Sequence, residues 1–182
     1  MKTYISMLRG INVSGQKKIL MVDLKALYEK IGFKEVVTYI QSGNVVFQAS
    51  KSLTEVEIIS MIQTAITEKY QFEVPVMIRL ADEIAAIIEN NPFLKQKDTD
   101  IERIYVAFLS EKPSEVYLEK VHTFDFSPDQ FVIVDKTIYL YYPVTGYGNS
   151  KMTNNFFESK LKVKATTRNW KTTKKLLELA KI

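Results

Sequence analysis

The sequence contains no cysteine and only one histidine, and these absences narrow the chemistry open to it. Without thiols, the chain forms no disulfide, iron–sulfur cluster or thiolate zinc site, and it has no cysteine nucleophile. The single histidine, His122, falls at the end of an expected helix without a recognisable Ser or Asp partner motif, so we interpret it as a surface or cap residue. The lack of cysteine fits a reducing cytoplasm, which is the location we expect.

Long uncharged stretches are also lacking. No apolar run approaches the roughly 20 residues that span a bilayer. The first ten residues are interrupted by Arg9 before an apolar segment of signal-peptide length. We therefore expect no membrane-spanning segment, no signal peptide and no membrane partner. With 46% hydrophobic and 25% charged residues, the composition is that of a globular protein rather than a disordered one.

Charge is unevenly distributed along the chain. The formal net charge is +4, but residues 151–182 carry nine Lys and Arg against two Glu, a local net charge of +7. A basic terminal region favours an anionic partner. Lysines in such a region are equally typical of the solvated faces of helices. The carboxylates of the polar segment at residues 95–100, together with Glu102, lack a calcium-loop pattern, so we assign them to solvent and expect no metal site.

Apolar periodicity predicts a first half with the element order βαββαβ, which is the ferredoxin-like unit. Gly32 lies where a left-handed residue would end the first helix, and Thr54 with Glu57 forms a capping box for the second. The expected strands are residues 4–8, 36–40, 45–47 and 74–80, and the expected helices are residues 20–31 and 54–66.

The second half repeats this order after a short bridging helix at residues 84–88 and a polar linker at residues 95–100. Its expected strands are residues 104–109, 131–134, 137–142 and 162–167, and its expected helices are residues 113–121 and 150–161. Asn169 is placed to cap a final helix. We therefore predict an α+β fold made by tandem duplication of two ferredoxin-like halves, residues 1–80 and 102–182, joined by residues 81–101. This repeat rests on element order, because residue similarity between the halves is negligible.

The strands indicate that the sheets are covered rather than open. Residues 104–109 are apolar on both alternating faces, which is typical of a strand buried on both sides. RNA-recognition motifs bind RNA on an open sheet face with aromatic side chains for stacking. Residues 43–47 lack the basic start and paired aromatics of that motif, so we disfavour this reading.

Four ordered motifs occur along nearly the whole chain: residues 8–15 (LRGINVSG), 38–47 (TYIQSGNVVF), 142–151 (YPVTGYGNSK) and 166–170 (TTRNW). Together they resemble the bacterial family catalogued as domain of unknown function 1697. The resemblance implies two ferredoxin-like halves, and it brings no agreed activity, cofactor or catalytic residue. Ser14 departs from the family pattern, which often has two consecutive glycines at the end of this motif.

Strand direction groups the motifs into two polar clusters. In a βαββαβ unit the first and second strands are parallel, so the loops that follow them emerge at one sheet edge. The third and fourth strands of the second half are parallel by the same argument. The candidate ligand-binding residues of the first cluster are Arg9, Gly10, Asn12, Gln41, Ser42, Gly43 and Asn44; those of the second are Gly146, Gly148, Lys151, Arg168, Asn169 and Trp170.

Each cluster combines glycines, a cation and a helix N-terminus, which are the ingredients of an anion site. The same residues also suit tight turns, caps and a buried ion pair, and the sequence leaves both readings open. We expect a phosphate-bearing or other anionic ligand in a cleft between the halves, with Arg168 as the best single contact. The alternatives are a nucleic-acid-associated accessory protein that uses the basic C-terminal region, and a non-catalytic interaction protein. Enzymatic activity, cofactors and oligomeric state stay open.

Overall fold

The structure is a computed structural model that describes residues 1–181. It divides into two compact units: Met1–Ala85 together with the segment from Lys175 on, and Ala86–Lys174. Two helices, α3 (Ala81–Glu89) and α6 (Trp170–Ala180), run from one unit into the other. The sequence assigns α6 wholly to the second half. The structure divides it, because tertiary contacts decide which unit a segment joins and element order does not reveal them.

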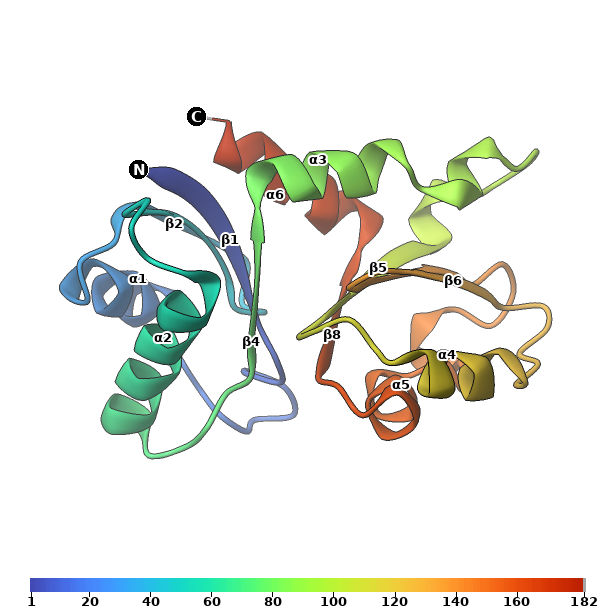
Figure 1. Cartoon of the computed structure of the whole chain (residues 1–182), viewed down its shortest axis with the longest axis horizontal. Coiled ribbons are helices and arrows are strands. Elements are labelled where there is room, and N and C mark those ends of the chain that lie inside the picture. Colours follow the sequence, from blue (N-terminus) through green and yellow to red (C-terminus); the bar gives the residue numbers. More distant parts are fainter. Residues whose placement is uncertain (182) are drawn as a thin grey trace. The chain divides into compact units, whose positions relative to one another are not determined.

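The first unit has one antiparallel sheet with the strand order β2-β3-β1-β4. This is the predicted ferredoxin-like order, in which β1 is central and parallel to β2. Helices α1 and α2 cover one face of the sheet (Figure 1). The elements are β1 (Lys2–Leu8), α1 (Met21–Lys30), β2 (Lys34–Tyr39), β3 (Asn44–Ala49), α2 (Glu55–Tyr70) and β4 (Val76–Leu80).

Local sequence signals account for the ends of both helices. Thr54 and Glu57 form the predicted capping box, in which Glu57 N–H donates to Thr54 Oγ1 and Glu57 accepts from Thr54 N–H at 2.8 Å. Gly32 follows α1 with a φ of 99°, a conformation that glycine adopts without a Cβ clash. Leu24 and Tyr28, one turn apart on α1, are completely buried, which fixes the face that packs on the sheet.

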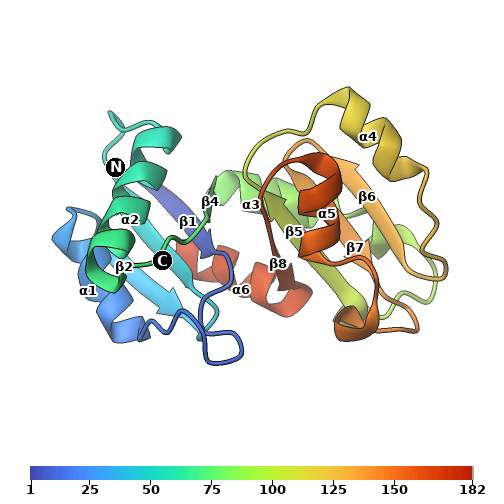
Figure 2. The ribbon, with the colours of Figure 1, turned by 90° about the horizontal axis from the view of Figure 1, so that it is seen from below.

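The second unit repeats this architecture, with one antiparallel sheet in the order β6-β7-β5-β8. Figure 2 shows α2 and α5 in front of the strands of their own sheets. The elements are the 3-10 helices η1 (Pro92–Lys95) and η2 (Ile101–Arg103), then β5 (Ile104–Leu109), α4 (Glu115–His122), β6 (Gln130–Val134), β7 (Thr137–Tyr141), the 3-10 helix η3 (Tyr147–Asn149), α5 (Asn154–Leu161) and β8 (Ala165–Asn169).

Several element boundaries differ from the sequence prediction, and the starts of α5 and β8 have a clear local cause. The helix expected from residue 150 begins at Asn154, because Thr153 caps it by accepting a hydrogen bond from Phe156 N–H at 3.1 Å. The strand expected at residues 162–167 begins at Ala165 and continues to Asn169. Lys162 has a φ of 61° at the end of α5, which is incompatible with an extended strand. The expected polar linker includes the end of η1 and leads into η2.

The central strand of each sheet is buried on both faces. On β1 the side chains that alternate with the helix-facing residues, Ile5 and Met7, are completely buried, as are Val106 and Phe108 on β5. The outer strands β2 and β6 retain exposed positions. This burial agrees with the covered sheets expected from the apolar strands. Among residues 1–181, no helix combines the length and apolar character needed to cross a membrane.

Candidate functional site

The loop after β1 lies against the turn between β2 and β3, as strand direction predicts. Asn12 joins the two segments, because its side-chain amide donates to the carbonyl oxygens of Gln41 at 2.8 Å and Ile19 at 2.9 Å. Its Oδ1 accepts a hydrogen bond from the N–H of Ile19 at 2.9 Å. Asn12 also has a φ of 55°, which asparagine tolerates better than most residues. The loop therefore uses the whole side-chain amide of Asn12 for its own structure.

Gly43 brings the turn into close contact with the loop. A Cβ at Gly43 would lie 2.8 Å from Cβ of Leu8 and 2.7 Å from Cδ1 of Ile11, and its φ is 74°. Leu8 N–H donates to the carbonyl oxygen of Gly43 at 2.9 Å. The next residue, Asn44, is completely buried and donates to Oγ of Ser42 at 2.9 Å. Both the available space and the backbone conformation require glycine at position 43, so this residue has a structural function in the turn.

Arg9 and Gly10 complete the first cluster. Gly10 has a φ of 71°, and no atom lies within 4 Å of the place where its Cβ would stand. Arg9 is half-buried, and its backbone N–H donates to the carbonyl oxygen of Pro75 at 2.9 Å. The predicted position of Asn12 beside Gln41 in the turn after β2 is thus confirmed, whereas the backbone contact of Arg9 is with Pro75. Their participation in ligand binding stays a prediction.

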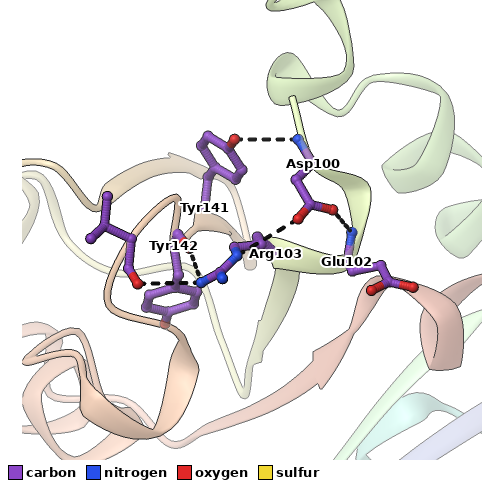
Figure 3. Close-up of polar contacts among 6 residues, drawn as sticks. Asp100, Glu102, Arg103, Tyr141 and Tyr142 are labelled. Atoms are coloured by element: carbon purple, nitrogen blue, oxygen red, sulfur yellow. Dashed lines mark hydrogen bonds and ion pairs between the residues drawn. The ribbon is translucent and has the colours of Figure 1, made fainter. Parts of the chain in front are cut away.

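In the second unit, an arginine outside the predicted clusters holds the glycine loop that follows β7. Arg103 donates from Nη1 to the carbonyl oxygens of Tyr142 at 3.4 Å and Val144 at 3.3 Å (Figure 3). Its Nε lies 3.7 Å from Oδ2 of Asp100. Asp100 in turn caps η2, accepting a hydrogen bond from Glu102 N–H at 3.0 Å. Asp100 therefore has a structural function in addition to its contact with solvent.

Three tyrosine rings pack beside this arginine. Tyr105 and Tyr147 stack with their ring centroids 4.8 Å apart, and Tyr142 meets both rings edge-on. These rings, Gly146, Arg103 and the carboxylates of Asp100 and Glu102 line a cavity of about 270 Å³. Two carboxylates against one guanidinium give this lining a negative charge, which disfavours the predicted anion contact at Gly146. The glycine loop is held instead by ring packing and by Arg103.

Arg168, the predicted anion contact, is only 7% exposed. Its Nη1 donates to Oγ1 of Thr166 at 2.8 Å and to the carbonyl oxygen of Thr167 at 2.9 Å. Burial lowers the pKa of the Arg168 guanidinium to about 10, since desolvation penalises the charged form. Lys151 is exposed and follows η3 between two buried residues, Ser150 and Met152. The predicted proximity of Lys151 to Arg168, and an anion at Arg168, stay predictions.

Arg79 occupies the position in the first unit that Arg168 occupies in the second. Each lies on the last strand of its sheet and pairs with the central strand, Arg79 opposite Ile5 and Arg168 opposite Val106. Arg79 is 3% exposed, and its Nη1 donates to the carbonyl oxygen of the preceding residue at 2.7 Å, as Nη1 of Arg168 does. The two units therefore share one residue-level feature that the sequence did not reveal.

Asn169 and Trp170 lie at the start of α6, where the sequence predicts them. Asn169 Oδ1 accepts a hydrogen bond from Thr172 N–H at 2.8 Å, which confirms the predicted cap. A cavity of about 440 Å³ opens beside this helix start. We call it the α6 cavity, and it is lined by Ile101, Glu102, Asn169, Trp170, Lys171 and Lys174.

The comparisons with known proteins agree with this architecture. A family model described as "Protein of unknown function (DUF1697)" matches residues 1–139. The chain belongs to this family. Among solved structures, a conserved bacterial protein from Streptococcus pneumoniae, SP0830, is similar over 98% of both chains, with a TM-score of 0.77 and 21% sequence identity. At this identity the likeness shows the DUF1697 fold alone. No curated protein is similar in sequence to the chain.

Sequence reasoning missed several residues of this DUF1697 protein that the structure brings to the second unit's sheet edge. Lys171 and Lys174 belong to the basic C-terminal region. Their i, i+3 spacing after the cap Asn169 indicates that they lie on one face of the helix. Arg103 and Glu102 follow the expected linker, and no local pattern distinguishes them from solvated charges. Within residues 1–181, no group of three or more His, Asp or Glu is placed to hold a metal ion.

Proposed function

We propose that this protein binds a small anionic ligand, such as a phosphate-bearing metabolite, in the α6 cavity of the second unit. The observation that carries the proposal is that Lys171 and Lys174 line the same cavity as Asn169 and Trp170, two residues of the closing motif. The volume of about 440 Å³ is within the range of small-molecule sites. The proposed site is lined by side chains of the second unit alone, whereas the sequence led us to expect a cleft between the halves.

The two lysines differ from their neighbour on the same helix. Lys175 forms an ion pair with Glu178 at 2.6 Å. Lys171 and Lys174 are exposed and have no ion-pair partner among residues 1–181. An anion in the α6 cavity would meet both ammonium groups, which are one turn apart.

Position on the helix supports the same conclusion. The first turn of a helix carries a partial positive charge, which favours anions and mildly disfavours cations. Lys171 and Lys174 follow the cap Asn169 within the first two turns of α6, so they add positive charge where the helix already carries it. A bound anion relieves this repulsion. Glu102 opposes anion binding, because its carboxylate lines the same cavity.

The distribution of basic residues favours a small anion over nucleic acid. Lys162 and Lys164 precede β8, whereas Lys171 and Lys174 follow it, so the two pairs lie at opposite ends of that strand. Five strand residues span roughly 13 Å. The charge of +7 in residues 151–182 is thus divided rather than gathered in one patch, which supports a site for one compact anion.

Thermal unfolding with a panel of nucleotides, sugar phosphates and tripolyphosphate tests the proposal. A ligand at 100 times its Kd stabilises the fold by about 2.7 kcal/mol, which raises the Tm of a chain of this size by roughly 5–10 °C. We expect a shift with at least one phosphate compound and a shallow dependence of affinity on salt. A steep dependence would indicate contacts with many phosphates and favour nucleic acid.

Three variants localise the effect. Lys171→Ala combined with Lys174→Ala removes both ammonium groups, and we expect affinity for the selected anion to fall about tenfold or more. Glu102→Gln removes the opposing carboxylate and should strengthen binding. Lys175→Ala is the matched control, because it removes a lysine of α6 that pairs with Glu178. If no anion shifts the Tm, or if the double variant binds as the parent chain does, the proposal is wrong.

A further inference from the structure

A second cavity of the same unit has an aromatic and acidic lining. Its volume is about 330 Å³, and it lies beside η1, the end of α4 and the start of β6. We call it the aromatic cavity, and its lining includes Phe93, Phe124, Phe126, Phe131, Asp125 and Asp129. Neither the predicted clusters nor the α6 cavity includes any of these residues.

Asp129 is the unusual member of this lining, because it is only 7% exposed. Its two carboxylate oxygens lie 2.7 and 2.6 Å from Oγ1 of Thr145. A hydroxyl donates one hydrogen, so it satisfies one carboxylate oxygen at a time. Among residues 1–181, no Lys, Arg or His forms an ion pair with Asp129. A buried carboxylate without a positive partner is costly, and a cationic ligand would supply that partner.

The rings around Asp129 are suited to the same kind of ligand. Phe126 meets Phe131 edge-on with centroids 6.0 Å apart and stacks on Phe124 at 6.3 Å. Lys160 already places its Nζ 5.1 Å from the centroid of Phe124, so one of these rings accepts a cation in the structure itself. Aromatic faces attract ammonium and guanidinium groups through the ring quadrupole.

Apart from Lys160, whose ammonium lies over Phe124, the titratable side chains beside Asp129 in this cavity are Asp125 and His122. Hydrogen bonds from Ser127 lower the pKa of the Asp125 carboxyl, which keeps it ionised and adds to the negative lining. The ring of His122 stacks on Phe131 with centroids 5.7 Å apart. Gln96 and Gln130 contribute neutral amides.

We propose that the aromatic cavity binds a small organic cation, an ammonium or guanidinium group carried on an apolar or aromatic stem. Asp129 is the counter-ion, and the phenylalanine rings contact the stem and the charge. This site is independent of the anion proposed for the α6 cavity, because the two linings share no residue.

Titration with benzylammonium, followed by NMR or calorimetry at pH 8 and low salt, tests the site. We expect saturable binding of benzylammonium, and binding at least ten times weaker for benzyl alcohol and for benzoate, which keep the ring but lose or reverse the charge. Equal binding of benzyl alcohol, or no saturable binding of benzylammonium, overturns the proposal.

Two variants separate the counter-ion from a structural role. Asp129→Asn keeps an acceptor for Thr145 and removes the charge, so we expect at least a tenfold loss of benzylammonium affinity without a lower Tm. Thr145→Val removes the hydroxyl and leaves the carboxylate, so affinity should be unchanged or higher. An Asp129→Asn variant that binds benzylammonium like the parent chain overturns the proposal.

A ring variant provides a second line of evidence if Asp129→Asn does not fold. Phe124 is 40% exposed, so Phe124→Leu removes a ring face without opening the core. We expect a several-fold loss of benzylammonium affinity, with a circular dichroism spectrum like that of the parent chain. Unchanged affinity in this variant counts against the aromatic contribution and overturns the site as proposed.

Discussion

The two units share one topology, but their polar clusters lie at opposite ends of the equivalent strands: where β1 ends in the first unit and where β5 begins in the second. In the first unit Asn12 forms hydrogen bonds within the loop after β1 and to the turn after β2, and Gly43 packs closely against that loop. In the second unit the edge at the start of β5 carries charged side chains around two cavities. The covering helices differ as well: α1 and α2 have 10 and 16 residues, whereas α4 and α5 have 8 residues each.

This difference shows that a polar motif with glycines does not by itself indicate a ligand site. Both units place glycines, an amide and a cation at a sheet edge. In the first, both polar atoms of the Asn12 side chain form hydrogen bonds, either within the loop or to the turn after β2. In the second, Lys171 and Lys174 line a cavity and form no ion pair among residues 1–181. The availability of the polar atoms, rather than the motif, separates a structural loop from a candidate site.

Glycine substitutions give the largest expected contrast between the units. In Gly43→Ala the new Cβ would lie within 3 Å of Leu8 and Ile11 in addition to adopting a positive φ. We expect a loss of about 3 kcal/mol in the free energy of unfolding, measured by urea denaturation. Gly146→Ala in the second unit has the same φ of 74°, but its nearest neighbour is Nη1 of Arg103 at 3.8 Å. It should cost about 1 kcal/mol.

Gly10→Ala serves as the control within the first unit, because Gly10 has a φ of 71° and open space around it. Its expected cost also is about 1 kcal/mol. If Gly43→Ala is no more damaging than Gly10→Ala and Gly146→Ala, the close contact between the loop and the turn is not what requires glycine.

Removal of the Asn12 side-chain amide should cause the next largest loss in the free energy of unfolding. Asn12→Ala leaves the N–H and carbonyl of Ile19 and the carbonyl of Gln41 without their side-chain partner, and we expect a loss of about 2 kcal/mol. Asn12→Gly tests the contribution of the positive φ, because glycine adopts it freely but makes none of the bonds. In the second unit, Asn149 donates a single exposed bond to Thr145 at 3.2 Å, so Asn149→Ala should cost less than about 0.5 kcal/mol. Equal losses for Asn12→Ala and Asn149→Ala would contradict the assignment.

Two buried tyrosines provide the smallest contrast, because we expect the units to behave alike. Tyr28 shares a hydrogen bond of 2.9 Å with Ser6 Oγ, and Tyr142 donates to the carbonyl oxygen of Met152 at 2.9 Å. Each Tyr→Phe variant should lose about 1 kcal/mol at neutral pH. Chemical denaturation on the parent chain and both variants measures this loss.

The pH dependence of stability provides a second test of Tyr28 and Tyr142. Burial raises the pKa of the Tyr28 and Tyr142 hydroxyls well above 10. Their stabilising contribution is therefore complete below pH 10 and is lost as the pH rises above the pKa of the unfolded chain. The free energy of unfolding should fall by up to about 1.4 kcal/mol per pH unit for each tyrosine. Each Phe variant should remove that part of the slope, and an unchanged alkaline slope would show that the hydroxyl already titrates in the folded protein.

The sequence by itself determined the order of the strands and α-helices and the position of Asn12 beside the turn after β2. Apolar periodicity, the capping box at Thr54 and Glu57 and the glycine after α1 are local signals, and strand direction follows from element order. These sufficed to place Asn12 beside Gln41 and to assign the cap Asn169.

Only the tertiary structure decided which polar groups remain available for a ligand. Whether an arginine is buried, as Arg168 is, or a lysine lines a cavity, as Lys174 does, depends on packing between segments far apart in the chain. The equivalence of Arg79 and Arg168 likewise appears only from strand register. Asp129 and Thr145 meet across 16 positions for the same reason. Local patterns set backbone conformation, whereas burial and charge balance arise from long-range contacts that no local pattern encodes.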